Sequence, residues 1–173
     1  IRKNSLAFGI FFAILAVSGV LNTGKILKEY KTAARSYENM RKEVQSASID
    51  EGGTEPEIDE EKLKKINPDY SFWIRIPGTS IDYPVVWGKE EAYYLDHGFD
   101  KEKHLSGAIF ADSARIPFVS ANTIVYGHNM KDGSMFSDLK KYKDKDFTRE
   151  HPYVEIYRHG KWISCPVTTS KVI

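Results

Sequence analysis

The chain has 173 residues, with 25 lysine and arginine residues against 24 aspartate and glutamate residues, and a single cysteine. This length allows about one domain, and a formal charge of +1 gives no global basic excess of the kind that marks nucleic-acid-binding proteins. One cysteine excludes an internal disulfide and any cysteine-rich zinc or iron–sulfur site, and the 41% share of hydrophobic residues excludes a chain disordered throughout.

The first predicted element is a hydrophobic helix near the N-terminus. Residues 6–21 (LAFGIFFAILAVSGVL) contain no charge, and two basic residues precede them. A membrane span needs roughly 17 to 25 apolar residues, so this run meets the lower limit if Asn22 and Thr23 lie at the interface. Basic residues before the run favour an uncleaved anchor, residues 1–24, with the remainder outside the cell. A cleaved signal peptide and a buried core helix are the alternatives.

A second helical pattern follows and leads into a linker. Between residues 22 and 45, apolar side chains recur every three or four positions and give one apolar helix face: Ile26, Tyr30, Ala33, Tyr37, Met40 and Val44. Residues 46–57 (SASIDEGGTEPE) offer almost nothing to bury and contain two glycines and a proline, which predicts a flexible linker. We therefore divide the chain into an anchor (1–24), an extracytoplasmic helix with its linker (25–57) and a folded domain (58–173).

The folded domain is predicted to be mainly β. A short helix over 58–66 precedes two strands that are separated by the turn pair Pro77-Gly78. The six expected strands are 72–76, 81–86, 107–111, 122–126, 153–157 and 161–165. Helical turns are expected at 89–95 and after a cap at Asp132 or Ser134, with four side chains in the core: Met135, Phe136, Leu139 and Tyr142. The order contains no strand–helix–strand alternation.

His128 is the candidate for proton transfer. It follows the β-branched strand at 122–126, directly after Gly127. Imidazole titrates near neutrality, so a positioned histidine can take a proton and return it, as acyl transfer requires. Spacing alone leaves a structural role open. The remaining histidines (His97, His104, His151 and His159) are interpreted as surface residues, and since they lack zinc-ligand spacing we expect neither a metal site nor a cofactor.

Residues 123–142, TIVYGHNMKDGSMFSDLKKY, resemble the histidine segment of class B sortases. The similarity extends through NPDYSFWIRIPGTSIDYPVVWG, EAYYLDHGFD, GAIFADSAR and KYKDKDFTREHPYVEIY, and it covers most of residues 67–157. Sortases are membrane-tethered enzymes of Gram-positive bacteria, so the resemblance agrees with the predicted anchor and implies a single-pass protein of the cell membrane.

The resemblance implies a sortase-type β-barrel of about eight strands with N-terminal helices, and a cysteine transpeptidase of the hydrolase class. In the family, a cysteine attacks the threonine carbonyl of a sorting signal, of the Asn-Pro-x-Thr type in class B, and leaves a thioester on the enzyme. An amine of the peptidoglycan cross-bridge then resolves the thioester, which joins the secreted protein to the cell wall. By motif match His128 takes the histidine role. The implied partners are a signal-bearing protein and that amine.

The nucleophile and the arginine of the family cannot be assigned by the same match. In the family the cysteine follows a Thr-Leu-x-Thr type strand well after the histidine segment, and the arginine lies on the next strand; neither motif occurs among the 173 residues. Cys165 stands only 37 positions beyond His128 and is read as a small buried hydrophobic residue rather than the nucleophile. Arg115, Arg149 and Arg158 have no better claim. We expect a C-terminally incomplete barrel; the alternative is an inactive membrane-anchored peptide-binding module or a non-functional remnant.

Overall fold

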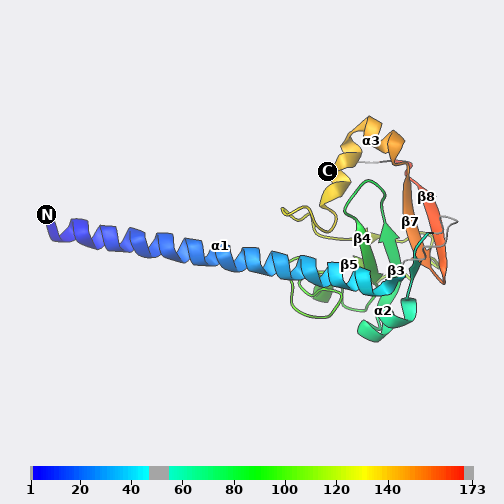
Figure 1. Cartoon of the computed structure of the whole chain (residues 1–173), viewed down its shortest axis with the longest axis horizontal. Helices are drawn as coiled ribbons and strands as arrows, with labels where there is room; N and C mark the ends of the chain where they lie inside the picture. Colours follow the sequence, from blue (N-terminus) through cyan, green and yellow to red (C-terminus); the bar gives the residue numbers. More distant parts are fainter. Residues whose placement is uncertain (1, 47–54, 170–173) are drawn as a thin grey trace.

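The computed structural model describes residues 2–46 and 55–169. A long N-terminal helix reaches away from a domain that contains all other elements (Figure 1). The helices are α1 (Arg2–Val44), α2 (Glu60–Ile66) and α3 (Lys145–Glu150), with the 3₁₀ helices η1 (Glu91–Leu95) and η2 (Ser137–Lys143). The strands are β1 (Gln45–Ser46), β2 (Glu57–Ile58), β3 (Tyr70–Arg75), β4 (Asp82–Val86), β5 (Ile109–Ala111), β6 (Val125–Tyr126), β7 (Tyr153–Arg158) and β8 (Lys161–Pro166).

A six-stranded sheet of order β6-β5-β4-β3-β7-β8 forms the centre of the domain. Only β4 and β5 are parallel; every other neighbouring pair is antiparallel. The six strands predicted from the sequence are confirmed. Within the described residues β6 and β8 each pair on one side only, so the sheet is open and does not close into the sortase-type barrel that the resemblance implies.

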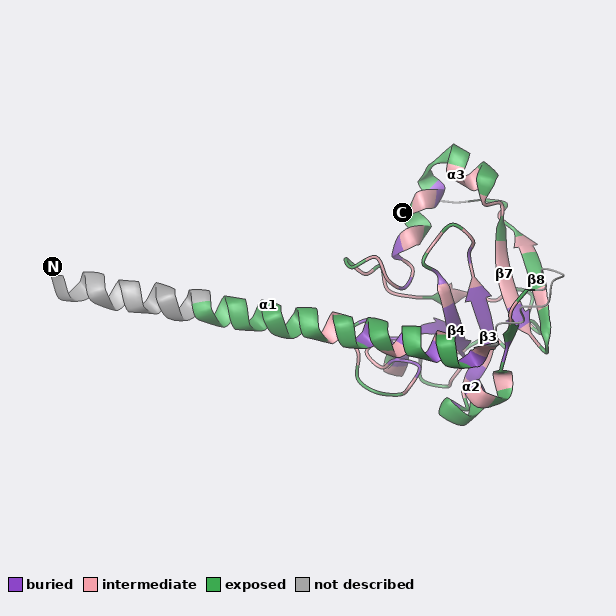
Figure 2. Ribbon diagram, viewed as in Figure 1, coloured by how far each residue is buried: buried purple, intermediate pink, exposed green. Residues whose placement is uncertain are grey.

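The core lies along the central strands. Phe72, Trp73 and Val85 are fully buried, and the Trp73 indole Nε1 donates to Asp82 Oδ1 at 2.6 Å. The C-terminal part of α1 packs on this core, as the buried residues at that end of the helix show (Figure 2). Tyr37 stands edge-on to Tyr83, with ring centroids 5.2 Å apart. The predicted apolar face of α1 therefore packs against the core of the domain.

That apolar face is used only in part. The buried residues of this face are Ala33, Tyr37, Met40 and Val44. Ile26 is exposed because it lies in the part of α1 that extends away from the domain. The predicted linker lies mostly at 47–54, outside the described residues. Its two described ends meet, since β1 pairs with β2 in antiparallel register, Gln45 opposite Ile58.

No helix within residues 2–46 and 55–169 is long and apolar enough to cross a membrane. The expected anchor at 1–24, the single-pass topology and the cell-membrane localisation are corrected by this finding.

The segment after His128 also differs from its prediction. The backbone of Met135 has φ +55°, in the left-handed region, so a helical period cannot be counted from this residue. The helical turns of η2 begin only at Ser137, and Asp132 accepts from the Ser134 hydroxyl instead of capping them. Met135 and Tyr142 are buried as predicted, but Leu139 is 40% exposed. The short helix expected at 89–95 is the 3₁₀ helix η1.

Candidate functional site

His128 lies two positions beyond Tyr126, the last residue of β6, at one edge of the sheet. β6 is paired with β5 through Phe110 and Tyr126, and the next residue, Gly127, passes so close to its neighbours that an added Cβ would lie 2.4 Å from Ile109 Cδ1. Beyond the histidine, the Phe136 amide donates to the His128 carbonyl at 3.0 Å. The backbone of His128 is therefore held from both sides.

The imidazole of His128 is held by a single backbone contact. Its Nε2 lies 2.7 Å from the carbonyl oxygen of Leu95, the last residue of η1. Because a carbonyl oxygen only accepts, Nε2 carries the hydrogen, and in the neutral ring Nδ1 is then the lone-pair nitrogen. Among the described residues Nδ1 has no protein hydrogen bond, and the side chain is half-exposed. The arrangement presents a proton acceptor to a ligand from outside.

Cys165 does not approach His128. It lies on β8, opposite Val154, and four strands separate β8 from β6 in the sheet order. Adjacent strands are about 4.8 Å apart, so the two residues are separated by roughly 24 Å along the sheet. The cysteine is partly exposed rather than buried, because β8 is an edge strand.

The three arginines weighed as candidates are engaged elsewhere. Arg115 pairs with Asp112, and Arg149 pairs with Asp146 at 2.7 Å. The Arg158 guanidinium lies over the Phe118 ring, 4.8 Å from its centroid. None of these three partners belongs to the loop that carries His128.

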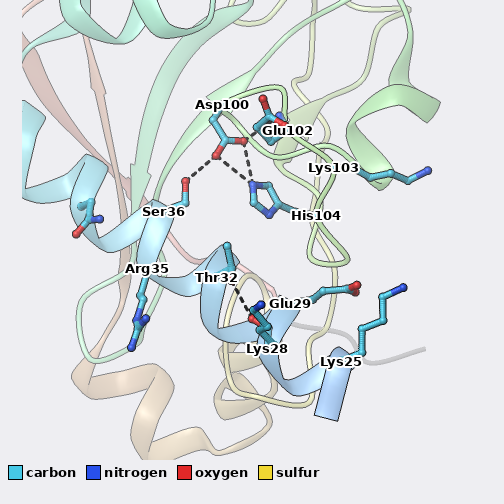
Figure 3. Close-up of a pocket in the computed structure, with 11 residues that line it drawn as sticks. Lys25, Lys28, Glu29, Thr32, Arg35, Ser36, Asp100, Glu102, Lys103 and His104 are labelled. Carbon is cyan, nitrogen blue, oxygen red and sulfur yellow. Dashed lines mark hydrogen bonds and ion pairs between the residues drawn. The ribbon is translucent and has the colours of Figure 1, made fainter. Parts of the chain in front are cut away.

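The prediction that the other histidines lie on the surface is correct for His159 and wrong for His104. The His104 side chain is 9% exposed and its Nε2 lies 3.0 Å from Asp100 Oδ1, while the Ser36 hydroxyl of α1 donates to Asp100 Oδ2 at 2.7 Å (Figure 3). These contacts fasten α1 to the loop after η1. Ser36, Asp100 and His104 line an open pocket of about 770 Å³ whose wall also includes Lys28 and Arg35.

We expect Asp100→Asn to lower the free energy of unfolding by about 1 kcal/mol at pH 7 and by much less at pH 3. Burial alone would raise the pKa of Asp100, but the hydrogen bonds from Ser36 and His104 outweigh it and lower the pKa below the ordinary 3.8. A carboxyl group whose pKa is lower in the folded than in the unfolded protein stabilises the fold at pH values above the unfolded-state pKa. This stabilisation is lost as the pH falls through the folded-state pKa. Urea unfolding of the wild type and of Asp100→Asn at pH 7 and pH 3 measures the difference in stability. An equal loss of stability at the two pH values would contradict the prediction.

Comparison with known proteins gives the site a family. A family model for the sortase domain matches residues 74–173, more than half of the chain. The chain belongs to the sortase family. Sortase B of Listeria monocytogenes is 52% identical over 91 residues, which cover 52% of this chain and 37% of that protein. Sortase B of Staphylococcus aureus is 33% identical over 155 residues, 86% of this chain and 63% of that protein.

Solved structures agree with this assignment. A mutant form of Clostridium perfringens sortase B aligns with a TM-score of 0.66 and 41% identity, covering 76% of this chain and 62% of that one. A Bacillus anthracis sortase B aligns with a TM-score of 0.68 and 28% identity, covering 85% and 72%. These relatives support a class B sortase. The match covers less than two thirds of the two curated relatives.

The sequence pattern points to His128 but not to the group that holds its ring. The partner is a backbone carbonyl 33 residues away, and a carbonyl carries no side-chain signal. The glycine of the GAIFA run was available as a signal, because a glycine before a buried strand can mark a close backbone approach.

Proposed function

We propose that this chain provides the histidine part of a class B sortase that cleaves an Asn-Pro-x-Thr type sorting signal and links the signal-bearing protein to peptidoglycan. The observation that carries the proposal is the placement of His128. Its ring is fixed at the end of β6 by the Leu95 carbonyl, with Nδ1 open to a ligand. Family membership supports the transpeptidase chemistry.

The proposed reaction has two acyl transfers. A cysteine thiolate attacks the threonine carbonyl, the peptide C–N bond breaks, and the protonated imidazole of His128 gives its proton to the leaving amine. The resulting thioester is then attacked by the amine of the peptidoglycan cross-bridge, which passes its proton to the neutral imidazole as the thiolate leaves. The histidine thus ends each cycle in the protonation state in which it began.

The proposal does not assign the nucleophile to Cys165. A general acid must lie within hydrogen-bond reach of the reacting group, about 2.6–3.2 Å or one water further. Cys165 lies on β8 and His128 lies just after β6, and these two strands form opposite edges of the sheet. The nucleophile is therefore expected on the later motif that class B sortases carry.

Exposed apolar side chains near the ring suit an extended peptide as substrate. Leu95, whose carbonyl holds the ring, is 47% exposed, and Tyr126, two positions before His128, is 43% exposed. Apolar surface beside a few fixed polar groups is typical of ligand-binding sites. A second candidate function, a peptide-binding module without chemistry, is favoured by the separation of Cys165 from His128.

A fusion protein separates these functions. The segment that follows the matched region in the Listeria monocytogenes relative is joined after Ile173, which supplies the later family motifs. We expect the fusion to cleave an Asn-Pro-x-Thr reporter peptide and not a scrambled one, the Cys165→Ala fusion to cleave equally well, and the unfused chain not to cleave.

Two results would overturn the proposal. Cleavage by the unfused chain that is lost in Cys165→Ala would make Cys165 the nucleophile. A fusion that melts cooperatively, binds the reporter and never cleaves it would favour the binding module.

A further inference from the structure

The group that holds His128 belongs to a closed loop. Leu95 ends η1, and residues 96–107 return the chain to β5. The Ala108 amide donates to the Tyr94 carbonyl at 2.9 Å and the His104 amide donates to the Asp96 carbonyl at 2.9 Å. These bonds bring the far end of the loop against the last residues of η1.

Gly107 is the residue of the loop that faces the Leu95 carbonyl. It has φ +55°, and an added Cβ would lie 2.5 Å from the Tyr94 carbonyl oxygen and 2.7 Å from the Leu95 carbonyl oxygen. Real Cβ atoms essentially never come this near backbone oxygens, so any side chain here would displace the carbonyl that His128 contacts. The missing side chain is what lets the Leu95 oxygen occupy its position.

Tyr37 of α1 braces Gly107 from the other side. Its hydroxyl donates to the Gly107 carbonyl at 2.9 Å and accepts from the Phe99 amide at 3.2 Å. The tyrosine is buried, and burial raises its pKa far above the usual value, so the hydroxyl stays a donor at all working pH. A continuous set of contacts thus leads from α1 through Gly107 to the Leu95 carbonyl.

We propose that Gly107 and the Leu95 carbonyl are positioning groups for His128: together they fix the Nε2–H tautomer and the ring orientation that leaves Nδ1 as the proton-transfer atom. The catalytic meaning of this inference rests on the proposed function. The tautomer and the hydrogen bond themselves are properties of the 173-residue chain and can be measured without turnover.

The experiment is nitrogen-15 NMR of the imidazole groups in the unfused chain. We expect the neutral His128 ring to show the Nε2–H tautomer, with an Nε2 proton protected from exchange. In Gly107→Ala that proton should exchange at least about tenfold faster, the effect of losing one ordinary hydrogen bond. Tyr37→Phe, which adds no atoms to the crowded site, should give a smaller acceleration in the same direction.

Two matched controls separate positioning from general destabilisation. Gly160→Ala introduces a side chain at a similar φ of +71°, in the β7–β8 turn, where nothing lies within 4 Å of the new Cβ; it should leave the His128 proton unchanged. Leu95→Ala removes the exposed side chain but keeps the backbone carbonyl, so the exchange rate of the His128 Nε2 proton should also be unchanged.

The outcomes are distinguishable from failure of the proposed function. A proton on Nδ1 of the wild-type ring, or unchanged exchange in both Gly107→Ala and Tyr37→Phe, would overturn the positioning inference. If Gly107→Ala does not fold, Tyr37→Phe alone decides. If the Nε2 proton is protected but the fusion never cleaves the reporter, the positioning inference stands and the proposed sortase reaction is rejected.

Discussion

Replacing His128 with glutamine is expected to lower kcat/KM of the fusion for the Asn-Pro-x-Thr reporter by about 10²- to 10⁴-fold. Glutamine keeps a side-chain amide that can donate to the Leu95 carbonyl, now 2.7 Å from Nε2, but it cannot accept a proton and return it. The loss therefore reports proton transfer rather than loop structure. Steady-state cleavage of the reporter measures it.

The matched control is His159→Asn. His159 is exposed in the β7–β8 turn and has φ +52°, a conformation that asparagine tolerates, so the fold and the cleavage rate should be unchanged. A His128→Gln fusion that retains most of its activity would contradict the assignment of proton transfer to this residue.

Trp73→Ala is expected to lower the free energy of unfolding by about 3–5 kcal/mol. Trp73 is fully buried on β3, between Pro84 of β4 and Tyr157 of β7, and its indole donates to Asp82. Truncation leaves a cavity in the centre of the sheet and removes a donor from a partly buried carboxylate. Urea unfolding of the 173-residue chain measures the change.

Trp162→Ala gives the comparison. Trp162 lies on the edge strand β8 and is only partly buried, so its truncation should cost less than half as much. Losses of equal size would mean that β3 is not the centre of the core.

The strands could be predicted from sequence because their signals are local. The run 122–126 is rich in β-branched residues and ends at Gly127-His128, and the Pro77-Gly78 pair separates two apolar runs. Both patterns report a half-buried extended backbone, and the structure contains strands at each place. His128 is a candidate site residue for the same reason, because it stands at the end of the strand predicted at 122–126.

What the sequence could not provide depends on contacts between distant segments. Ser36 and Asp100 are 64 residues apart, and the Leu95 carbonyl that receives the His128 hydrogen bond has no side-chain signature. The polar local sequence predicts a surface position for His104, whereas its side chain is 9% exposed and contacts Asp100, which also accepts a hydrogen bond from Ser36 of α1. Hydropathy likewise marks residues 6–21 as an apolar run, whereas in the structure this run is part of the longer helix α1, and no helix among the described residues is long and apolar enough to cross a membrane.

The most direct test of the proposed reaction is mass spectrometry of the products that the fusion forms from an Asn-Pro-x-Thr peptide in the presence of an amine acceptor such as triglycine. We predict cleavage after threonine, with the amine joined to the threonine carbonyl, in the wild-type and Cys165→Ala fusions, and loss of this product in His128→Gln. Cleavage at another bond, or transfer that persists without His128, would contradict the proposal.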